Sequence, residues 1–257
     1  MNKIDLRERY AIERSKWDHY AAQARPIERR QLVDHDDFHS FAARQSILSY
    51  IAEFLGDVRG KKILECGCGD GHIATLFARS GAQVIAFDLS GASLEVAKQR
   101  AHLNGVQRDV LLQLAGAETL PYRSESFDIV FGRAILHHLE LSLAIPEIRR
   151  VLKPGGKAAF LEPLGMNPLL ELVRDHVWYP HKKGHGVDQP LTYEDIRRVG
   201  EGYRYATFRE FRLLSMVERA FGYNVHFSIL RRIDEVLLRV CPALKRYCQS
   251  VAITLRK

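Results

Sequence analysis

Long apolar runs are missing from this sequence. No uninterrupted hydrophobic stretch among its 257 residues approaches the roughly 18 residues that a membrane-spanning helix requires. Residues 1–14 are charged throughout and lack the apolar centre of a secretory signal peptide. The sequence therefore argues against a membrane-spanning protein and predicts a cytoplasmic one.

Cysteine is also scarce. The four cysteines are Cys66, Cys68, Cys241 and Cys248. None of them belongs to a C-x-x-C pair or to a Cys/His cluster with zinc-site spacing, which fits reduced thiols. His181 and His185 have the spacing of some metal ligands, but no third ligand accompanies them. We therefore predict no metal site.

Acidic residues are few towards the C-terminal end. Residues 204–257 contain eleven Lys or Arg against four Asp or Glu, an excess of seven that equals the formal net charge of +7. Such a surplus suits nucleic acid, a membrane surface, an acidic substrate or simply a solvated face. Because the arginines are dispersed over helix and strand patterns, we interpret the surplus as a solvated face and predict no nucleic-acid partner.

One stretch, residues 62–74, organises the rest of the sequence. It begins with the apolar end of a strand, and Glu65 follows at the carboxyl end of that strand. Gly67, Gly69 and Gly71 then predict a turn that lets the backbone approach a ligand, because glycine has no Cβ. A strand, a glycine turn and a helix form a ligand cradle in open α/β sheets. The G-x-G-x-G spacing differs from the G-x-G-x-x-G of dinucleotide-binding proteins.

Strand and helix patterns alternate around this turn. Five strands are expected at residues 61–64, 83–87, 110–114, 127–132 and 157–161. Helices are expected between them at residues 73–79, 90–103 and 141–152, and a Pro-Gly-Gly turn is expected at 154–156. This alternation predicts an α/β fold with a doubly wound parallel sheet.

The flanking segments are expected to be mainly helical. Before the sheet we expect two helices, at residues 1–25 and 38–55. After Pro163 we expect helices at 169–179, 192–199 and 227–239, a polar loop at 181–190, and strands at 207–215 and 251–255.

An aspartate at the end of the second strand adds a specific signal. Asp88 lies 17 residues after Gly71. A carboxylate there can accept hydrogen bonds from both hydroxyls of a ribose, because it is an acceptor-only group with two oxygens. The alternative is a plain acidic residue at a helix N-terminus. With the glycine turn upstream, we favour the ribose role.

Four segments together carry a resemblance to a known family. They are residues 63–71 (ILECGCGDG), 84–90 (VIAFDLS), 117–130 (AETLPY, then SFDIV) and 150–156 (RVLKPGG). In this order and spacing they resemble the class I S-adenosylmethionine-dependent methyltransferases, in the group that includes the ubiquinone and menaquinone C-methyltransferases. Outside residues 61–162 the resemblance is weak.

The resemblance implies a fold and a domain organisation. The fold is a seven-stranded, mostly parallel, Rossmann-like sheet whose last strand is antiparallel, with N-terminal helices and a helical insertion after the fifth strand. The chain is then a single domain over residues 1–257. Its parts are a helical cap at 1–58, a cofactor-binding core at 61–162, an acceptor-pocket insertion at 163–206, and C-terminal strands and helix at 207–257.

The resemblance also implies S-adenosyl-L-methionine as the cofactor. The glycine turn and Glu65 then lie near its methionine part, Asp88 binds the ribose, and Leu89 with the 117–118 pair contacts the adenine. Many relatives have an aspartate where this chain has Gly116, so backbone is expected to replace that contact. The implied cofactor-binding residues are Glu65, Gly67, Cys68, Gly69, Gly71, Asp88, Leu89, Ala117, Glu118, Arg133 and His138. We add Tyr20, because the expected N-terminal helix can close over the cofactor.

Methyl transfer sets the search for catalytic residues. A sulfonium is already a good leaving group, so the protein mainly aligns the reactants and excludes water, and a base helps if the acceptor is a hydroxyl or an enolisable carbon. We name His185 as the candidate base, followed by Glu162. The polar segment after Pro163 favours a small-molecule methyl acceptor. Alternatives are an RNA or protein methyltransferase, a nicotinamide dehydrogenase, or a non-catalytic protein that binds the cofactor, and no oligomeric state follows from the sequence.

Overall fold

The computed structural model describes residues 5–23, 37–168, 189–219 and 228–257. The helix expected at 169–179 lies outside these residues. So do the loop residues up to 188, which include His181 and His185. None of the helices in the described part of the chain is long and apolar enough to cross a membrane.

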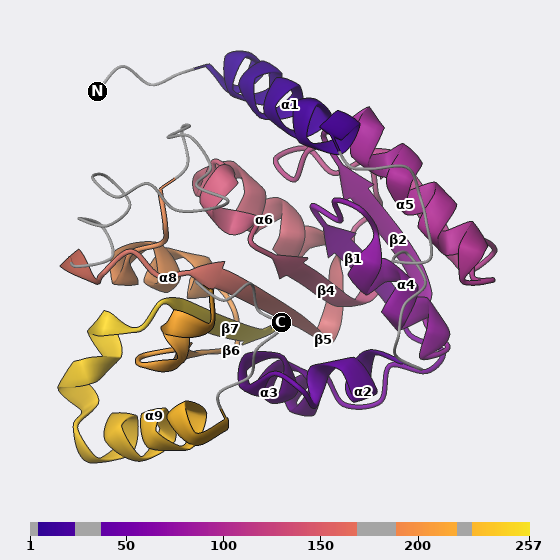
Figure 1. The fold of residues 1–257 in the computed structure, drawn as a ribbon. Coiled ribbons are helices and arrows are strands. Elements are labelled where there is room, and N and C mark those ends of the chain that lie inside the picture. The colour runs from indigo at the N-terminus through magenta and orange to yellow at the C-terminus, as the bar shows by residue number, and fades with distance from the viewer. Residues whose placement is uncertain (1–4, 24–36, 169–188, 220–227) are drawn as a thin grey trace.

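The strands form one seven-stranded sheet in the order β3-β2-β1-β4-β5-β7-β6 (Figure 1). Neighbours among β1 to β5 pair in parallel, whereas β7 pairs antiparallel with both β5 and β6. This confirms the doubly wound sheet with an antiparallel last strand. The strands are β1 Lys62–Cys66, β2 Gln83–Asp88, β3 Val110–Leu114, β4 Phe127–Arg133, β5 Leu152–Pro163, β6 Tyr205–Phe211 and β7 Ser250–Arg256.

Helices cover both faces of the sheet (Figure 1). Successive strand residues alternate between the two cores: Ile63 packs with the cluster on one face and Leu64 with the cluster on the other. The helices are α1 Leu6–Gln23, α2 Phe38–Ala42, α3 Ser46–Leu55, α4 His72–Arg79, α5 Gly91–Leu103, α6 Leu141–Val151, α8 Tyr193–Gly200 and α9 Ser228–Val240. Short 3-10 turns are η2 Leu136–His138, η3 Ser215–Arg219 and η4 Pro242–Tyr247.

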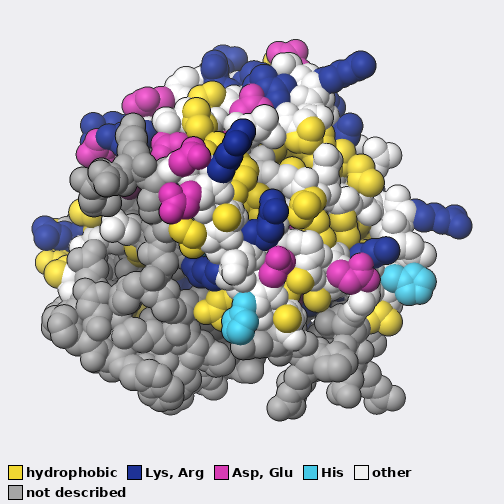
Figure 2. All heavy atoms as spheres, turned by 90° about the horizontal axis from the view of Figure 1, so that it is seen from above, with side chains coloured by type: hydrophobic (Ala, Val, Ile, Leu, Met, Phe, Trp, Pro, Cys, Tyr) yellow, Lys and Arg dark blue, Asp and Glu magenta, His cyan; other side chains and the backbone are white. Residues whose placement is uncertain are grey.

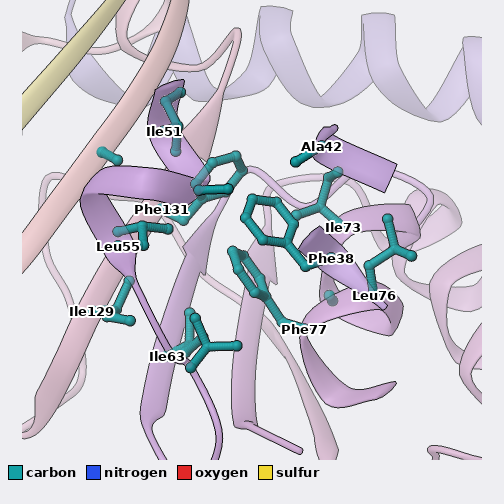
Figure 3. Packing of buried hydrophobic residues seen from close by; sticks show 14 of the residues in the cluster. Phe38, Ala42, Ile51, Leu55, Ile63, Ile73, Leu76, Phe77, Ile129 and Phe131 are labelled. Atoms are coloured by element: carbon teal, nitrogen blue, oxygen red, sulfur yellow. The ribbon is translucent and has the colours of Figure 1, made fainter. Parts of the chain in front are cut away.

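The single helix expected over residues 38–55 is wrong, because the structure has two helices there. Asp37 begins α2, and its side chain accepts a hydrogen bond from the Ser40 N–H at 2.7 Å. Phe38 is fully buried, with its ring centroid 4.2 Å from that of Phe77 and 6.0 Å from that of Phe131 (Figure 3). The break between α2 and α3 lets both short helices turn their apolar residues into the same core.

The Pro-Gly-Gly segment is a bulge within β5 instead of a separate turn before it. Phe127 pairs with Leu152, but Ile129 already pairs with Lys157, so the register of β4 against β5 shifts across the segment. The bulge is held by Lys257, whose carbonyl accepts the Gly155 N–H at 3.0 Å. A contact with the far end of the chain thus decides a feature that looks local in the sequence.

Candidate functional site

A cavity of about 400 Å³ lies beyond the carboxyl ends of β1, β2 and β4, the ligand edge of an open α/β sheet. Its walls come from the glycine turn, from the ends of these strands and from residues 115–118. Helix α1 supplies Arg9, Tyr10, Glu13 and Trp17 to the lining. The N-terminal helix is therefore a wall of the site.

The three glycines of the turn do different things. All have positive φ, but a Cβ on Gly67 would lie 2.5 Å from the side chain of Ile135, and one on Gly71 would lie 2.6 Å from the Cβ of Ala97 in α5. A Cβ on Gly69 would meet nothing within 4 Å. Gly67 and Gly69 line the cavity, whereas Gly71 is absent from the lining. Gly71 serves the packing of α4 on α5, and Gly69 presents bare backbone to a ligand.

This division gives a testable difference in stability. Gly71→Ala combines left-handed strain with overpacking against the α5 backbone, so we expect it to lower the free energy of unfolding by about 2–4 kcal/mol. Gly105→Ala is the matched control, because Gly105 has nearly the same φ, +72° against +73°, and open space around its Cβ. It should cost only the strain, about 1–2 kcal/mol. Urea unfolding of both variants measures the difference, and equal losses would contradict the packing role.

Asp88 ends β2 at the rim of the cavity, beside Leu89, which also lines it. Its Oδ2 accepts the Gly69 N–H and its Oδ1 accepts the Ser90 N–H, both at 2.9 Å. Burial raises the pKa of this carboxyl, and these two backbone donors partly offset the rise. Each carboxylate oxygen retains a second lone pair, so Asp88 can bind two ligand hydroxyls while it holds the turn.

Glu65 is a buried carboxyl group at the end of β1. It is 3 % exposed and lines the cavity, and its Oε2 has no hydrogen-bond partner among the described residues. Burial, followed by the nearby charge of Asp70, raises its pKa to about 8. A buried, unpartnered acceptor beside a cavity is the arrangement expected where a cationic group of a ligand binds.

Arg100 clamps the turn from the side of α5, and the sequence analysis did not single it out. Its Nε donates to the Asp70 carbonyl at 2.9 Å, and its Nη2 donates to Asp70 Oδ2 at 2.6 Å. The Arg100 side chain is only 7 % exposed. The sequence shows an arginine in the helix after β2, but its spacing from Asp70 does not indicate that the two residues pair.

Tyr10 of α1 occupies the space opened by Gly116. A Cβ on Gly116 would lie 2.1 Å from the Tyr10 hydroxyl oxygen. That hydroxyl donates to Glu118 Oε2 at 2.6 Å, while Glu118 Oε1 accepts the Glu140 N–H at 3.0 Å. Burial and the bond to Glu118 both raise the pKa of Tyr10. Helix α1 can therefore dock over the cavity in this way only because residue 116 has no side chain.

A second contact joins α1 to η2, the 3-10 turn that follows β4. Glu13, 2 % exposed, lies with its Oε2 3.2 Å from His138 Nδ1, and the same oxygen accepts the Trp17 Nε1–H at 3.0 Å. A carboxylate is an acceptor here, so Nδ1 carries the imidazole proton and the basic lone pair of the neutral ring is on Nε2. Glu13 and His138 both line the cavity.

Glu162 lies outside the cavity, whereas a catalytic base must face the bound acceptor. It is fully buried and does not line the cavity. Its Oε1 accepts the N–H groups of Ile135 and Leu136 at 2.9 Å each, and its Oε2 lies 2.7 Å from His137 Nδ1. The rings of His137 and His138 are 4.0 Å apart between centroids. Glu162 thus holds the turn that carries both histidines.

The structure brings together most of the expected cofactor-binding residues. Ten of the twelve line the one cavity: Glu65, Gly67, Cys68, Gly69, Asp88, Leu89, Ala117, Glu118, Arg133 and His138. Gly71 packs on α5 instead, and Tyr20, 37 % exposed, lies on α1 outside the lining. His185 lies outside the described residues.

Several known proteins are similar in sequence to part of this chain. Residues 64–160 match the model of the "Methyltransferase domain" family. A ubiquinone biosynthesis O-methyltransferase of Alkalilimnicola ehrlichii is 37 % identical over 123 residues, which is 47 % of this chain and 49 % of that protein. Methyltransferase GfsG of Streptomyces halstedii is 34 % identical over 122 residues, 47 % of this chain and 44 % of that protein. The similarity spans about half the length of these relatives.

Solved structures extend the likeness of fold to nearly the whole chain. Geranyl diphosphate C-methyltransferase of Streptomyces coelicolor, solved with Mg²⁺, geranyl diphosphate and S-adenosyl-L-homocysteine, has a TM-score of 0.66 at 14 % identity. That comparison covers 98 % of this chain and 99 % of the other. The [4+2]-cyclase SpnF has the same fold at a TM-score of 0.56 and 21 % identity, covering 85 % of this chain and 82 % of that one. The fold alone therefore does not define the reaction.

Fold, cavity and sequence match agree with one another. The sheet order and the glycine cradle at its carboxyl edge are those expected from the resemblance to the class I S-adenosylmethionine-dependent methyltransferases. The match to a methyltransferase domain covers residues 64–160, which include most of the residues that line the cavity.

Proposed function

We propose that this protein binds S-adenosyl-L-methionine in the cavity and transfers its methyl group to a small organic molecule. The observation that carries the proposal is Glu65, a buried carboxyl group with an oxygen that has no partner among the described residues, in a cavity that also exposes the bare backbone of Gly69. Such a site suits a ligand with a cationic group and a part that needs close backbone approach. The cofactor has both, in its ammonium and its methionine chain.

The lining residues fit the rest of the cofactor. Glu65 would hold the ammonium, Asp88 the ribose hydroxyls, and Leu89 with Ala117 the adenine, each with chemistry suited to that group. Glu118 is already bonded to Tyr10 and to the Glu140 N–H. We therefore assign Glu118 to the docking of α1, and its expected contact with the adenine is indirect.

When bound, the cofactor supplies an activated methyl group on a sulfonium, so the residues of the chain need only position the acceptor and exclude water. Helix α1 does the second through Tyr10 and Glu13, which close one side of the cavity. His138, oriented by Glu13, is the cavity-lining group suited to take a proton from the acceptor at its Nε2. We propose Glu162 as the residue that positions the histidine turn, and His185 remains a candidate base.

The acceptor is proposed to be a small molecule and not a nucleic acid. The face of the molecule seen from above carries Lys and Arg interspersed with Asp and Glu and shows no continuous basic area (Figure 2). Binding of a polyanion at this face would depend on such an area. We propose that residues 61–162 are the cofactor-binding core and that residues 163–206 are the segment that completes the acceptor pocket.

Titration calorimetry tests the cofactor assignment. We expect micromolar binding of S-adenosylmethionine, and we expect Asp88→Ala to raise the Kd roughly 5- to 150-fold, or about 1–3 kcal/mol, through lost charge-assisted hydrogen bonds. Asp57→Ala is the control, since Asp57 is 72 % exposed and does not line the cavity. Circular dichroism would verify that both variants are folded.

Two outcomes would contradict the proposal. Tight NADH binding would overturn the cofactor, and methyl incorporation into RNA in place of a metabolite extract would overturn the acceptor class. Binding of the cofactor without turnover of any acceptor in the extract would favour a non-catalytic binding protein.

A further inference from the structure

Helix α9 exposes a row of aliphatic side chains. Ile229, Ile233, Val236 and Val240 are 72 %, 40 %, 61 % and 76 % exposed. They follow one another at intervals of four, three and four residues, which places them in a single stripe along one side of the helix. Scattered surface aliphatics need no explanation, but four aligned on one helix form a patch.

The orientation of this stripe is set from the opposite side of the helix. Asp234, 5 % exposed, accepts four hydrogen bonds from the chain entering η3: its Oδ1 bonds the Leu214 N–H, and its Oδ2 bonds the N–H of Leu213 and both the N–H and the hydroxyl of Ser215. Arg231, also on the inner side, pairs with Glu218 at 2.7 Å. Rotating α9 to bury the stripe would break these contacts. They therefore hold the helix with the stripe facing outward.

Cations flank the stripe. Arg232 and Arg239 are exposed, and they lie four residues before and three residues after Val236, along one edge of the aliphatic row. No ion pair joins either arginine to a carboxylate in the described part of the chain, although Glu235 lies within about one helical turn of both. An apolar stripe with a cationic edge is the pattern of a helix that lies in a membrane interface.

A second copy of the chain is a weaker match for the same surface. Four aliphatic side chains cover far less than the roughly 800 Å² per partner of a standard stable interface. Each copy would also bring its own arginines to the contact. An anionic lipid surface satisfies both features, because its phosphates pair with the arginines and its acyl region takes the aliphatic groups.

We propose that α9 binds the surface of an anionic phospholipid bilayer, with the aliphatic stripe at the boundary between headgroups and acyl chains and with Arg232 and Arg239 at the phosphates. The helix lies at the outer edge of the molecule, at the opposite end from α1 (Figure 1), and α1 is the helix that lines the cavity. Docking through α9 therefore leaves that side accessible. The proposal is independent of the methyl-transfer function.

Vesicle co-sedimentation of the full chain tests this surface. We expect binding to vesicles that contain phosphatidylglycerol, weaker binding to vesicles of phosphatidylcholine alone, and loss of binding with added salt. The double variant Ile229→Asn/Val240→Asn should weaken binding at least tenfold, since it removes the two most exposed aliphatic groups. Arg232→Gln/Arg239→Gln should lower the preference for anionic vesicles about fivefold per arginine.

Leu111→Asn is the matched control, because Leu111 is 59 % exposed but belongs to the edge strand β3. It should bind vesicles like the unaltered protein. Sedimentation velocity without lipid tests the alternative, a second copy of the chain bound at the stripe. A dimer that the α9 variants dissociate would assign the stripe to that second copy. That result, absence of binding to anionic vesicles, or equal binding by the Ile229/Val240 variant, would each overturn the proposal.

Discussion

Glu65→Gln is expected to stabilise the protein and to weaken its affinity for S-adenosylmethionine. The carboxyl of Glu65 is buried, and its pKa is raised to about 8 by burial and by the charge of Asp70. Near neutral pH the folded state must hold this group protonated, whereas the unfolded state leaves it ionised. The amide has no such cost, so we expect the free energy of unfolding to rise by about 2–4 kcal/mol at about pH 7 to 8.

The gain in stability should depend on pH with a definite sign. Between the ordinary glutamate value of 4.5 and about 8, the folded protein binds more protons at Glu65 than the unfolded chain does. The stability of the unaltered protein therefore falls as pH rises through this window, by up to about 1.4 kcal/mol per pH unit from this group. The variant lacks this slope, so the two unfolding curves should converge near pH 4.5 and separate most near pH 8.

Urea unfolding at a series of pH values and calorimetry with the cofactor measure the two effects. Affinity should fall roughly tenfold or more, because the cation of the cofactor favours ionisation of Glu65 on binding and the amide cannot ionise. Glu210→Gln is the control: Glu210 is also buried, but it accepts a hydrogen bond from Tyr193 and lies outside the cavity lining. It should not stabilise the protein. A Glu65 variant that loses stability and keeps its affinity would remove Glu65 from the cofactor site.

His138→Ala is expected to lower turnover by about 10²- to 10⁴-fold if the acceptor is a hydroxyl or an enolisable carbon, the range typical of a lost general base. The reason is the position of the ring, which lines the cavity with Nδ1 directed at Glu13 and its basic lone pair on Nε2. Glu13→Gln should have a smaller effect, because the ring keeps its base but loses the carboxylate that orients it.

Pre-steady-state turnover separates these roles, because it isolates the chemical step from binding of the acceptor. His102→Ala, on the exposed end of α5, is the control and should leave this rate unchanged. Unchanged turnover in His138→Ala with an oxygen or carbon acceptor would mean that alignment alone drives the reaction or that His185 supplies the base.

The local sequence alone was enough to predict the glycine turn that forms the ligand cradle. The turn after β1 needs three residues with positive φ, and only glycine adopts that conformation without strain, so its place is readable directly. Ser90 caps α5 as expected, and the boundaries of β3 agree with the expected 110–114. The seven-stranded order came from the resemblance to a family, since the periodicity of each strand alone does not define its neighbours.

What only the tertiary structure decided lies on α1 and at the end of β4. Tyr10 meets Glu118 across 108 positions in sequence, and the reason for Gly116 is the tyrosine that fills its space. The pairing of Glu13 with His138 likewise needs α1 to dock over the cavity. Glu162 ends at the ligand edge of the sheet, as the sequence predicted, but the turn after β4 donates two backbone N–H groups to it and directs it away from the cavity. A side chain's position along the chain is local information, whereas its partner depends on how distant elements pack.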